Sequence, residues 1–385
     1  MVHVFDEITP DALREAGWKK WTEFGTATGA WIAEMDFGTA PAVQETLRRA
    51  AEGAGLGYLS SAALRAMQEA FAGFVGDRYG WQVDPADVRP APDVLTAMQA
   101  AVRLCSRPGS PIVLPTPAYM PFLTVPAALD REVIQVPMAR DGDRYVYDLD
   151  ALDAAFAAGG DLLVLCNPHN PIGRVLEREE LVAVSEVVER HGAHVFADEI
   201  HAPLVYAPHR HVPYASVSDA AAGHTLTAMS ASKAFNLPGL KSAQVVLSND
   251  ATREAWRGRG HVVEDQASTI GTLAATAAYR DGTAWLDDVV AYLDGNRRLL
   301  ADLVAEHLPG VRYDEPEGTY LAWLDLRGTG VEDPARHFRR EADVVATSGA
   351  LCGEVGRGFL RLNFATSRPV LTDAVTRMGR ALARV

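Results

Sequence analysis

Short apolar runs of strand length recur through the middle of the chain and alternate with segments of helical periodicity. The strand-like runs are Ile112–Leu114, Leu162–Cys166, His194–Ala197, Thr225–Met229 and Gln244–Leu247. The helix-like segments are Pro41–Glu52, Ala62–Tyr79, Val94–Leu104 and the amphipathic stretch Arg178–Arg190. Continuous apolar strands separated by helices are typical of a largely parallel sheet that is covered on both faces. We therefore expect an α/β fold.

The pattern changes after about residue 280. A long helix pattern, Trp285–His307, is followed by three strand-like segments and a final helix. The three segments are Tyr320–Leu326, Val344–Ala346 and Phe359–Asn363. This order predicts a smaller α+β domain at residues 281–385 after a large domain at 46–280, with residues 1–45 joining the small one.

Composition excludes several classes of function. The chain has 385 residues and a formal net charge of −14, which disfavours binding to nucleic acid or to anionic membranes. We find no uncharged apolar stretch of about 18 residues that could span a bilayer, and the acidic N-terminus does not resemble a signal peptide. The three cysteines lie far apart without metal-ligand spacing. We therefore expect a cytoplasmic protein with reduced thiols and without a metal site.

Polar side chains follow three of the apolar runs directly. Asn167 and Asn170 come after the run that ends at Cys166, and Asp198 and His201 come after Ala197. The third set is Ser230, Ser232 and Lys233, which come after Met229. In α/β sheets, ligands bind at the carboxyl ends of the strands, so these groups are expected to share one site. Arg361 lies inside the apolar run Phe359–Asn363, where an unpaired charge would be costly, and we expect it to face an anion.

Lys233 is one of only four lysines among 36 lysines and arginines. Lysine can form a Schiff base, whereas the guanidinium of arginine does not deprotonate at usable pH. Taken alone, Lys233 fits a solvated loop lysine better than a catalytic one, and only the residues around it change this interpretation. Lys241 is its only rival for the imine and lacks the hydroxyl-rich context, whereas Lys19 and Lys20 are expected on a solvated face.

These groups together fit pyridoxal phosphate (PLP). This cofactor needs a lysine that forms an imine and a carboxylate that keeps its ring nitrogen protonated, so that the ring can accept electrons from the substrate Cα. It also needs hydrogen-bond donors for its phenolate oxygen. Its phosphate needs a cradle, which helix N-termini and nearby hydroxyls can provide.

The chain resembles the fold-type I, aspartate aminotransferase-like PLP enzymes, and within them the MalY/PatB family of carbon–sulfur β-lyases of the cystathionine β-lyase type. The resemblance covers nearly the whole chain. Its motifs are WIAEMDF, GY at Gly57–Tyr58, TPAY, NPHNPIG, FADEIH, SASKAFNLPG, TYLAWLDLR and GRGFLRLNFA. It implies a fold-type I transferase fold, in which a large domain holds a mostly parallel seven-stranded sheet and a smaller domain is α+β.

The resemblance also implies how the cofactor is held. Lys233 would form the imine and then act as the base, Asp198 would pair with the ring nitrogen, and Tyr119 would stack on the ring. Asn170 would donate to the phenolate oxygen, with His201 beside it. The phosphate would be held by Ser230, Ser232, Lys241, the backbone amides of Val94 and Leu95, and Tyr58 from the second subunit of a homodimer.

On the substrate side, the resemblance implies that Arg361 clamps the α-carboxylate in a bidentate manner. Asn170 and Asp36 are the other substrate-binding candidates. Four positions depart from the family pattern: Glu34, Ile172, Cys352 and Asp93. Asp93 falls in the phosphate cradle, and we expect its carboxylate to point away as the N-cap of the following helix.

The function implied is a PLP-dependent C–S β-lyase, which cleaves cystathionine or another S-substituted L-cysteine to a thiol, pyruvate and ammonia. A PLP-dependent aminotransferase acting on an amino acid or a specialised metabolite is the alternative, because the same carbanion chemistry can end in transamination. A third possibility is a protein of this fold whose main role is to bind a partner.

Overall fold

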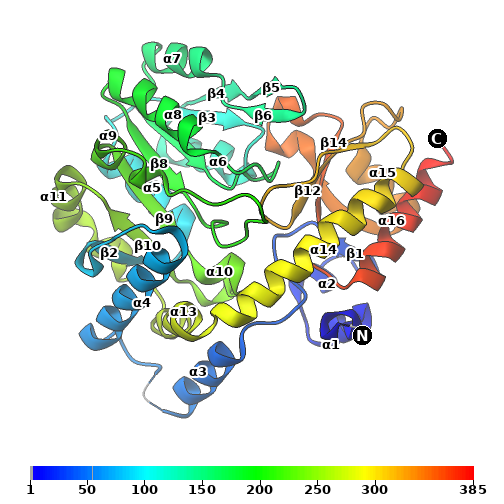
Figure 1. Cartoon of the computed structure of the whole chain (residues 1–385), viewed down its shortest axis with the longest axis horizontal. Helices are drawn as coiled ribbons and strands as arrows, with labels where there is room; N and C mark the ends of the chain where they lie inside the picture. The colour runs from blue at the N-terminus through cyan, green and yellow to red at the C-terminus, as the bar shows by residue number, and fades with distance from the viewer. Residues whose placement is uncertain (1–2, 54) are drawn as a thin grey trace.

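A computed structural model describes residues 3–53 and 55–385 of the chain (Figure 1). Its centre is a seven-stranded sheet in the order β2-β10-β9-β8-β7-β3-β4. The strands are β2 (Val88–Ala91), β3 (Ile112–Thr116), β4 (Val133–Pro137), β7 (Leu162–Cys166), β8 (His194–Asp198), β9 (Thr225–Met229) and β10 (Ala243–Leu247). Strand β10 pairs antiparallel with both of its neighbours, and the pairings from β9 to β4 are parallel. The predicted mostly parallel seven-stranded sheet is confirmed.

Helices cover this sheet on both faces, as expected for buried parallel strands. The helices before and around it are α3 (Pro41–Glu52), α4 (Ser61–Tyr79), α5 (Val94–Leu104), α6 (Met120–Thr124), α7 (Leu149–Ala157), α8 (Arg178–Arg190), α9 (Asp219–Gly223), α10 (Ala231–Ala234), α11 (Asp250–Arg259), α12 (His261–Glu264) and α13 (Thr269–Asp281). Helix α5 packs in the apolar cluster on one face, whereas α7 and α8 pack in the cluster on the other.

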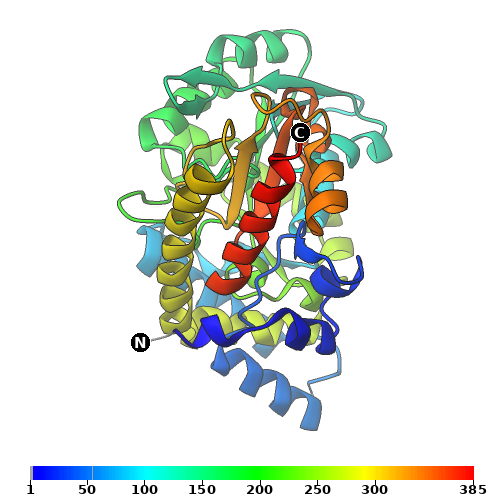
Figure 2. The same cartoon turned by 90° about the vertical axis from the view of Figure 1, so that its right-hand side faces the viewer.

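A second sheet of five strands has the order β1-β13-β14-β12-β11. Its strands are β1 (Thr28–Ala30), β11 (Arg312–Tyr313), β12 (Leu321–Asp325), β13 (Val344–Ser348) and β14 (Phe359–Asn363), and a separate hairpin is formed by β5 (Ala139–Asp141) and β6 (Arg144–Val146). Helices α14 (Thr283–His307), α15 (Pro334–Ala342) and α16 (Arg368–Leu382) belong to this part of the chain, and α16 lies beside both others (Figure 2). The boundaries predicted at residues 45 and 280 stay a prediction.

The N-terminal segment joins the second sheet. Its helices are α1 (Pro10–Glu15) and α2 (Lys19–Thr22), and its strand β1 pairs in parallel with β13. Figure 1 shows this segment, in dark blue, beside the C-terminal helices. Among the described residues, no helix combines the length and the apolar character that a bilayer crossing requires.

Local sequence accounts for most helix boundaries. Asp93 begins α5 by accepting a hydrogen bond from the backbone N–H of Thr96 at 2.8 Å, as predicted for an N-cap.

The sequence pattern did not predict two strands of the large sheet, β2 and β4, which form its two edges. Strand β2 contains Pro90, and every residue of β4 except Val136 is half-buried or exposed, so neither strand gives a continuous apolar run.

The structure also corrects the prediction that Lys20 is exposed to solvent. The sequence predicted it on a solvated face, but its side chain is buried and its Nζ lies 3.1 Å from a carboxylate oxygen of Asp36. Trp21 donates its Nε1–H to the other oxygen of Asp36 at 2.9 Å. A buried charge must be paired, so this contact fixes α2 against the segment that follows β1.

Candidate functional site

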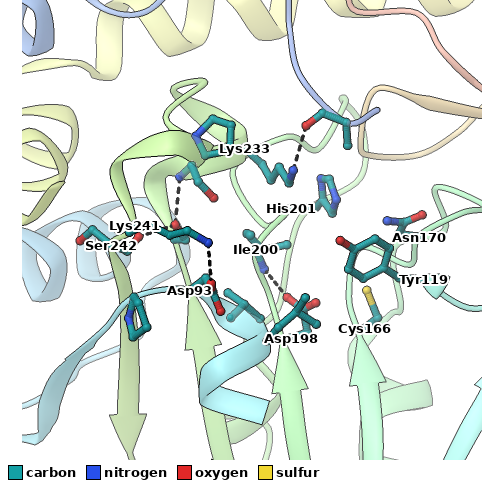
Figure 3. A pocket seen from close by; sticks show the side chains of 17 residues that line it. Asp93, Tyr119, Cys166, Asn170, Asp198, Ile200, His201, Lys233, Lys241 and Ser242 are labelled. Carbon is teal, nitrogen blue, oxygen red and sulfur yellow. Dashed lines mark hydrogen bonds and ion pairs between the residues drawn. The ribbon is translucent and has the colours of Figure 1, made fainter. Parts of the chain in front are cut away.

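A cavity of about 200 Å³ lies at the carboxyl ends of β7, β8 and β9 (Figure 3). The strands are in register there, because Cys166 pairs with Asp198 and Asp198 pairs with Ala228. The groups that follow the three strands therefore meet at one edge of the sheet. The predicted site residues in the lining are Val94, Leu95, Tyr119, Asn170, Asp198, His201, Ser230, Ser232, Lys233 and Lys241.

Lys233 lies on the short helix α10 and extends its ammonium group into the cavity. Its Nζ donates to the backbone carbonyl of Ala33 at 2.8 Å (Figure 3). Burial lowers the pKa of Lys233 to about 8, with Glu34 opposing and Arg361 reinforcing the shift. The neutral fraction of this amine is thus far larger than that of an ordinary lysine and becomes substantial at mildly basic pH, as an imine-forming and proton-moving lysine requires.

Asp198 ends β8 with its carboxylate buried at the cavity floor. One oxygen accepts the backbone N–H of Ile200 at 3.1 Å. Burial raises the pKa of Asp198 to about 7, and the neighbouring Glu199 adds to this effect. A carboxylate in this state is well suited to pair with a cationic ring nitrogen, because such a partner would restore its charged form.

His201 is the other acid–base group at this strand end. Burial lowers its pKa to about 3, and the charges of Lys233 and Arg361 act in the same direction. The imidazole is therefore neutral at physiological pH and can offer one N–H and one lone pair. Its ring lies edge-on to that of Tyr320, with the centroids 5.9 Å apart.

Arg361 and Asn170 connect the two sheets. Arg361 lies on β14, is 2% exposed, and donates to the Oδ1 of Asn170 at 3.0 Å and to the carbonyl of Trp31 at 3.0 Å. Its Nε has no hydrogen-bond partner among the residues that the structure describes. Because the Oδ1 of Asn170 is used as an acceptor, the amide nitrogen of Asn170 is the end left to donate, as the predicted contact with a phenolate oxygen requires.

The other end of the cavity begins at the N-terminus of α5. The chain enters this helix at Val94 and Leu95, and backbone amides in the first turn of a helix favour an anion. Lys241 lies opposite, with its Nζ 3.0 Å from the carboxylate of Asp93. Burial alone would raise the pKa of Asp93, but the hydrogen bonds from Thr96 and Lys241 outweigh it and lower the pKa. Lys241 is thus shared between Asp93 and any anion bound here.

Ser230 and Ser232 both line the cavity, but the hydroxyl group of Ser230 is already engaged within the protein. The hydroxyl of Ser230 donates to the carbonyl of Ser242 at 2.7 Å and accepts the N–H of Ser232 at 3.0 Å. Its only proton is therefore already used in this arrangement. Ser232 also lines the cavity.

Two predicted residues lie apart from these. The carboxylate of Asp36 is 1% exposed and is paired with Lys20. It lines neither this cavity nor an adjoining groove that is bordered by Trp31, Glu34 and Arg361. Its charge is paired with Lys20 inside the protein, and its assignment to substrate binding stays a prediction. Tyr58 is fully exposed in the single chain and outside the cavity lining, so its predicted contact across a dimer stays a prediction.

Sequence reasoning missed the part of the site made by backbone. The carbonyl of Ala33 accepts both the Lys233 ammonium at 2.8 Å and the Tyr320 hydroxyl at 3.0 Å. A backbone carbonyl leaves no signature in residue types. Asn236 holds this segment in place, because its side-chain amide bonds the N–H and the carbonyl of Met35. The departures Ile172 and Cys352 are buried in an apolar cluster and do not line the cavity.

A half-buried lysine that lines one cavity with a strand-end carboxylate, and an adjoining groove with a buried arginine, is the arrangement of an α/β enzyme of amino-acid chemistry. The profile of the aminotransferase class I and II family matches residues 32–378, and the chain belongs to this family. The resemblance to its carbon–sulfur lyase branch is confirmed by the relatives below.

The chain is 38% identical to a cystathionine β-lyase of Corynebacterium glutamicum, over 94% of this chain and 96% of the relative. It is 31% identical to the cystathionine β-lyase PatB of Bacillus subtilis, over 94% and 96% of the two chains. A crystal structure of a putative PLP-dependent β-cystathionase from Corynebacterium diphtheriae superposes with a TM-score of 0.92, at 39% identity and 98% coverage of both chains. The predicted fold-type I architecture is thereby confirmed.

Proposed function

We propose that the protein is a PLP-dependent carbon–sulfur β-lyase that cleaves cystathionine or another S-substituted L-cysteine. The observation that carries the proposal is the position of Lys233, which lines one cavity together with Asp198 and an adjoining groove together with Arg361. The relatives named cystathionine β-lyase, which match almost the full length of the chain, support the same reaction.

The cavity residues fit the cofactor from end to end. Lys233 would hold it covalently, Asp198 would keep its ring nitrogen protonated, and Tyr119 would cover the ring. Asn170 and His201 would bond the phenolate oxygen. The amides of Val94 and Leu95 would hold the phosphate, together with Ser232 and Lys241, all of which border the same cavity. Ser230 borders it too, but its hydroxyl would donate to the phosphate only by releasing the carbonyl of Ser242.

When bound, PLP supplies an electron sink for the pair released at the substrate Cα. Arg361 binds the substrate α-carboxylate and so fixes which bond of Cα is aligned for cleavage. The Lys233 amine takes the Cα proton, and its low pKa keeps a neutral fraction ready for this task. The Cβ–S bond then breaks, and sulfur leaves with the electron pair as a thiolate. Addition of water to the remaining fragment gives pyruvate and ammonia.

The reaction is tested with purified protein, PLP and L-cystathionine, without any oxoacid. Pyruvate and free thiol should form in equal amounts over many turnovers. A single turnover that resumes only when an oxoacid is added would instead identify the aminotransferase. Lys233→Ala should abolish turnover and the yellow cofactor band, whereas Lys19→Ala, a matched control at an exposed lysine outside the cavity lining, should keep both.

We further infer a homodimer in which Tyr58 reaches the phosphate of the neighbouring subunit. Tyr58 and the nearby Leu56 are strongly exposed in the single chain, and exposed large apolar groups favour an interface. Light scattering should give twice the mass of the 385-residue chain. Tyr58→Phe should weaken PLP binding without changing that mass, and an unchanged affinity would argue against the contact.

The amino-acid substrate and the cytoplasmic location belong to the same proposal. Cys105, Cys166 and Cys352 are all free thiols, which suits a reducing compartment. Cell fractionation of the native host would test the location.

A further inference from the structure

A groove of about 670 Å³ leads from the cavity toward the small sheet. It shares Ala33, Tyr119 and Lys233 with the cavity, and Arg361 lines it as well. The residues proposed to hold the reacting end of the substrate therefore border this groove. The groove is the space into which the remainder of a bound substrate would extend.

One wall of the groove is cationic. Arg336 and Arg339 lie three residues apart on α15, so they are neighbours on one face of the helix, and both line the groove. The Arg339 guanidinium lies over the ring of Phe24, with its Cζ 4.7 Å from the centroid. Phe24 in turn packs edge-on against Trp31 at 5.3 Å. The contact with this aromatic pair thus holds the Arg339 guanidinium in position at the groove.

These two arginines have their charge available for a ligand. Within residues 3–53 and 55–385, neither Arg336 nor Arg339 forms an ion pair with a carboxylate. The next residue along α15 differs, because the Nε of Arg340 lies 2.7 Å from the carboxylate of Glu341 and Arg340 is not in the groove lining. The same short helix therefore presents paired charge outside the groove and unpaired charge inside it.

The groove is lined mainly by positively charged side chains, whereas the chain as a whole is negatively charged. The charged groups in its lining are Arg336, Arg339, Arg361, Lys233 and a single carboxylate, Glu34. The chain as a whole carries a formal net charge of −14. A concave cationic surface on an acidic protein attracts and orients anionic ligands.

We propose that Arg336 and Arg339 form a subsite for a carboxylate at the distal end of the sulfur substituent, so that the enzyme prefers cysteine thioethers with an acidic tail. Guanidinium groups bind carboxylates through charge-assisted, often bidentate hydrogen bonds. The inference rests on the proposed function for the identity of the substrate, but the subsite can be tested without turnover.

The test uses two amino acids that lack a leaving group and have equal chain length. L-2-aminopimelate carries a distal carboxylate and L-2-aminoheptanoate does not. Their Kd values are measured by absorbance titration of the PLP-loaded protein. The wild type should bind the acidic ligand at least about tenfold more tightly, as one charge-assisted contact would give. Arg336→Gln/Arg339→Gln should remove this preference, and the matched control Arg340→Gln should retain it.

Three outcomes would overturn the subsite: no preference in the wild type, no binding of either ligand, or equal weakening of both in the double variant. The single variants Arg336→Gln and Arg339→Gln, checked for folding by circular dichroism, provide a second measurement if the double variant is unstable. A preserved preference with no pyruvate released from any cysteine thioether would refute the proposed lyase and leave the subsite intact.

Discussion

The buried ion pair of Lys20 and Asp36 predicts a large and specific loss of stability when one partner is removed. Both side chains are 1% exposed, and the further acceptors of the Lys20 Nζ among the described residues are the carbonyls of Ala365 at 3.3 Å and Glu34 at 3.4 Å. In Lys20→Met the Asp36 carboxylate would remain buried with only the Trp21 N–H as a donor. Breaking such a pair costs roughly 3–5 kcal/mol.

Urea titrations followed by circular dichroism measure this loss as a change in the free energy of unfolding. Lys20→Met should lose about 3–5 kcal/mol. Adding Asp36→Asn should recover most of the loss, because it removes the orphaned charge and keeps an acceptor for Trp21. A matched surface control is Lys241→Met, whose partner Asp93 is partly exposed, so that about 1 kcal/mol or less is expected.

Two results would refute this reasoning. The first is a loss below about 1 kcal/mol for Lys20→Met, the value typical of exposed pairs. The second is a double variant that is no more stable than the single one. A separate measurement addresses the earlier assignment of Asp36 to substrate binding: folded Asp36→Asn enzyme should retain its KM, whereas a direct substrate contact would raise it.

Three further predictions concern the site. Arg361→Lys should lower kcat/KM at least about tenfold for neutral and acidic thioethers alike, because it removes the planar guanidinium group that binds a carboxylate through two hydrogen bonds. A loss confined to acidic thioethers would contradict the role of Arg361 at the α-carboxylate. Asp93→Ser keeps an N-cap but frees Lys241 for the phosphate. PLP titration should therefore give a Kd that is lower by a few-fold, which corresponds to about 1 kcal/mol, and weaker binding would argue against this role of Lys241. The pKa of Asp198, raised by burial to about 7, means that the cofactor-free folded protein holds a proton that the unfolded chain releases near pH 4. Its contribution therefore weakens stability as pH rises from about 4 to 7, and Asp198→Asn should gain thermal stability over the wild type at pH 8 but not at pH 4; a pH-independent difference would disprove this.

The groups that carry chemistry were predictable because strand ends can be read from local pattern. An apolar run such as Leu162–Cys166 identifies a buried strand, and parallel strands align their carboxyl ends. Asn170, Asp198 and Lys233 could thus be assigned to one site before their distances were known. The edge strands β2 and β4 gave no such run, because an edge is partly exposed and tolerates proline.

The remaining features depend on residues far apart in the chain. Lys20 reads as a surface lysine beside two tryptophans, and only the approach of Asp36 and Ala365 makes it a buried cation. Ala33 contributes a carbonyl, which every residue has, and becomes part of the site only through its contact with Lys233. Sequence by itself determined which side chains could do the chemistry, since that follows from residue type and strand position. The tertiary structure decided which charges are neutralised, as at Lys20, and which have no carboxylate partner among the described residues, as at Arg336 and Arg339, because pairing and burial arise only when distant segments pack together.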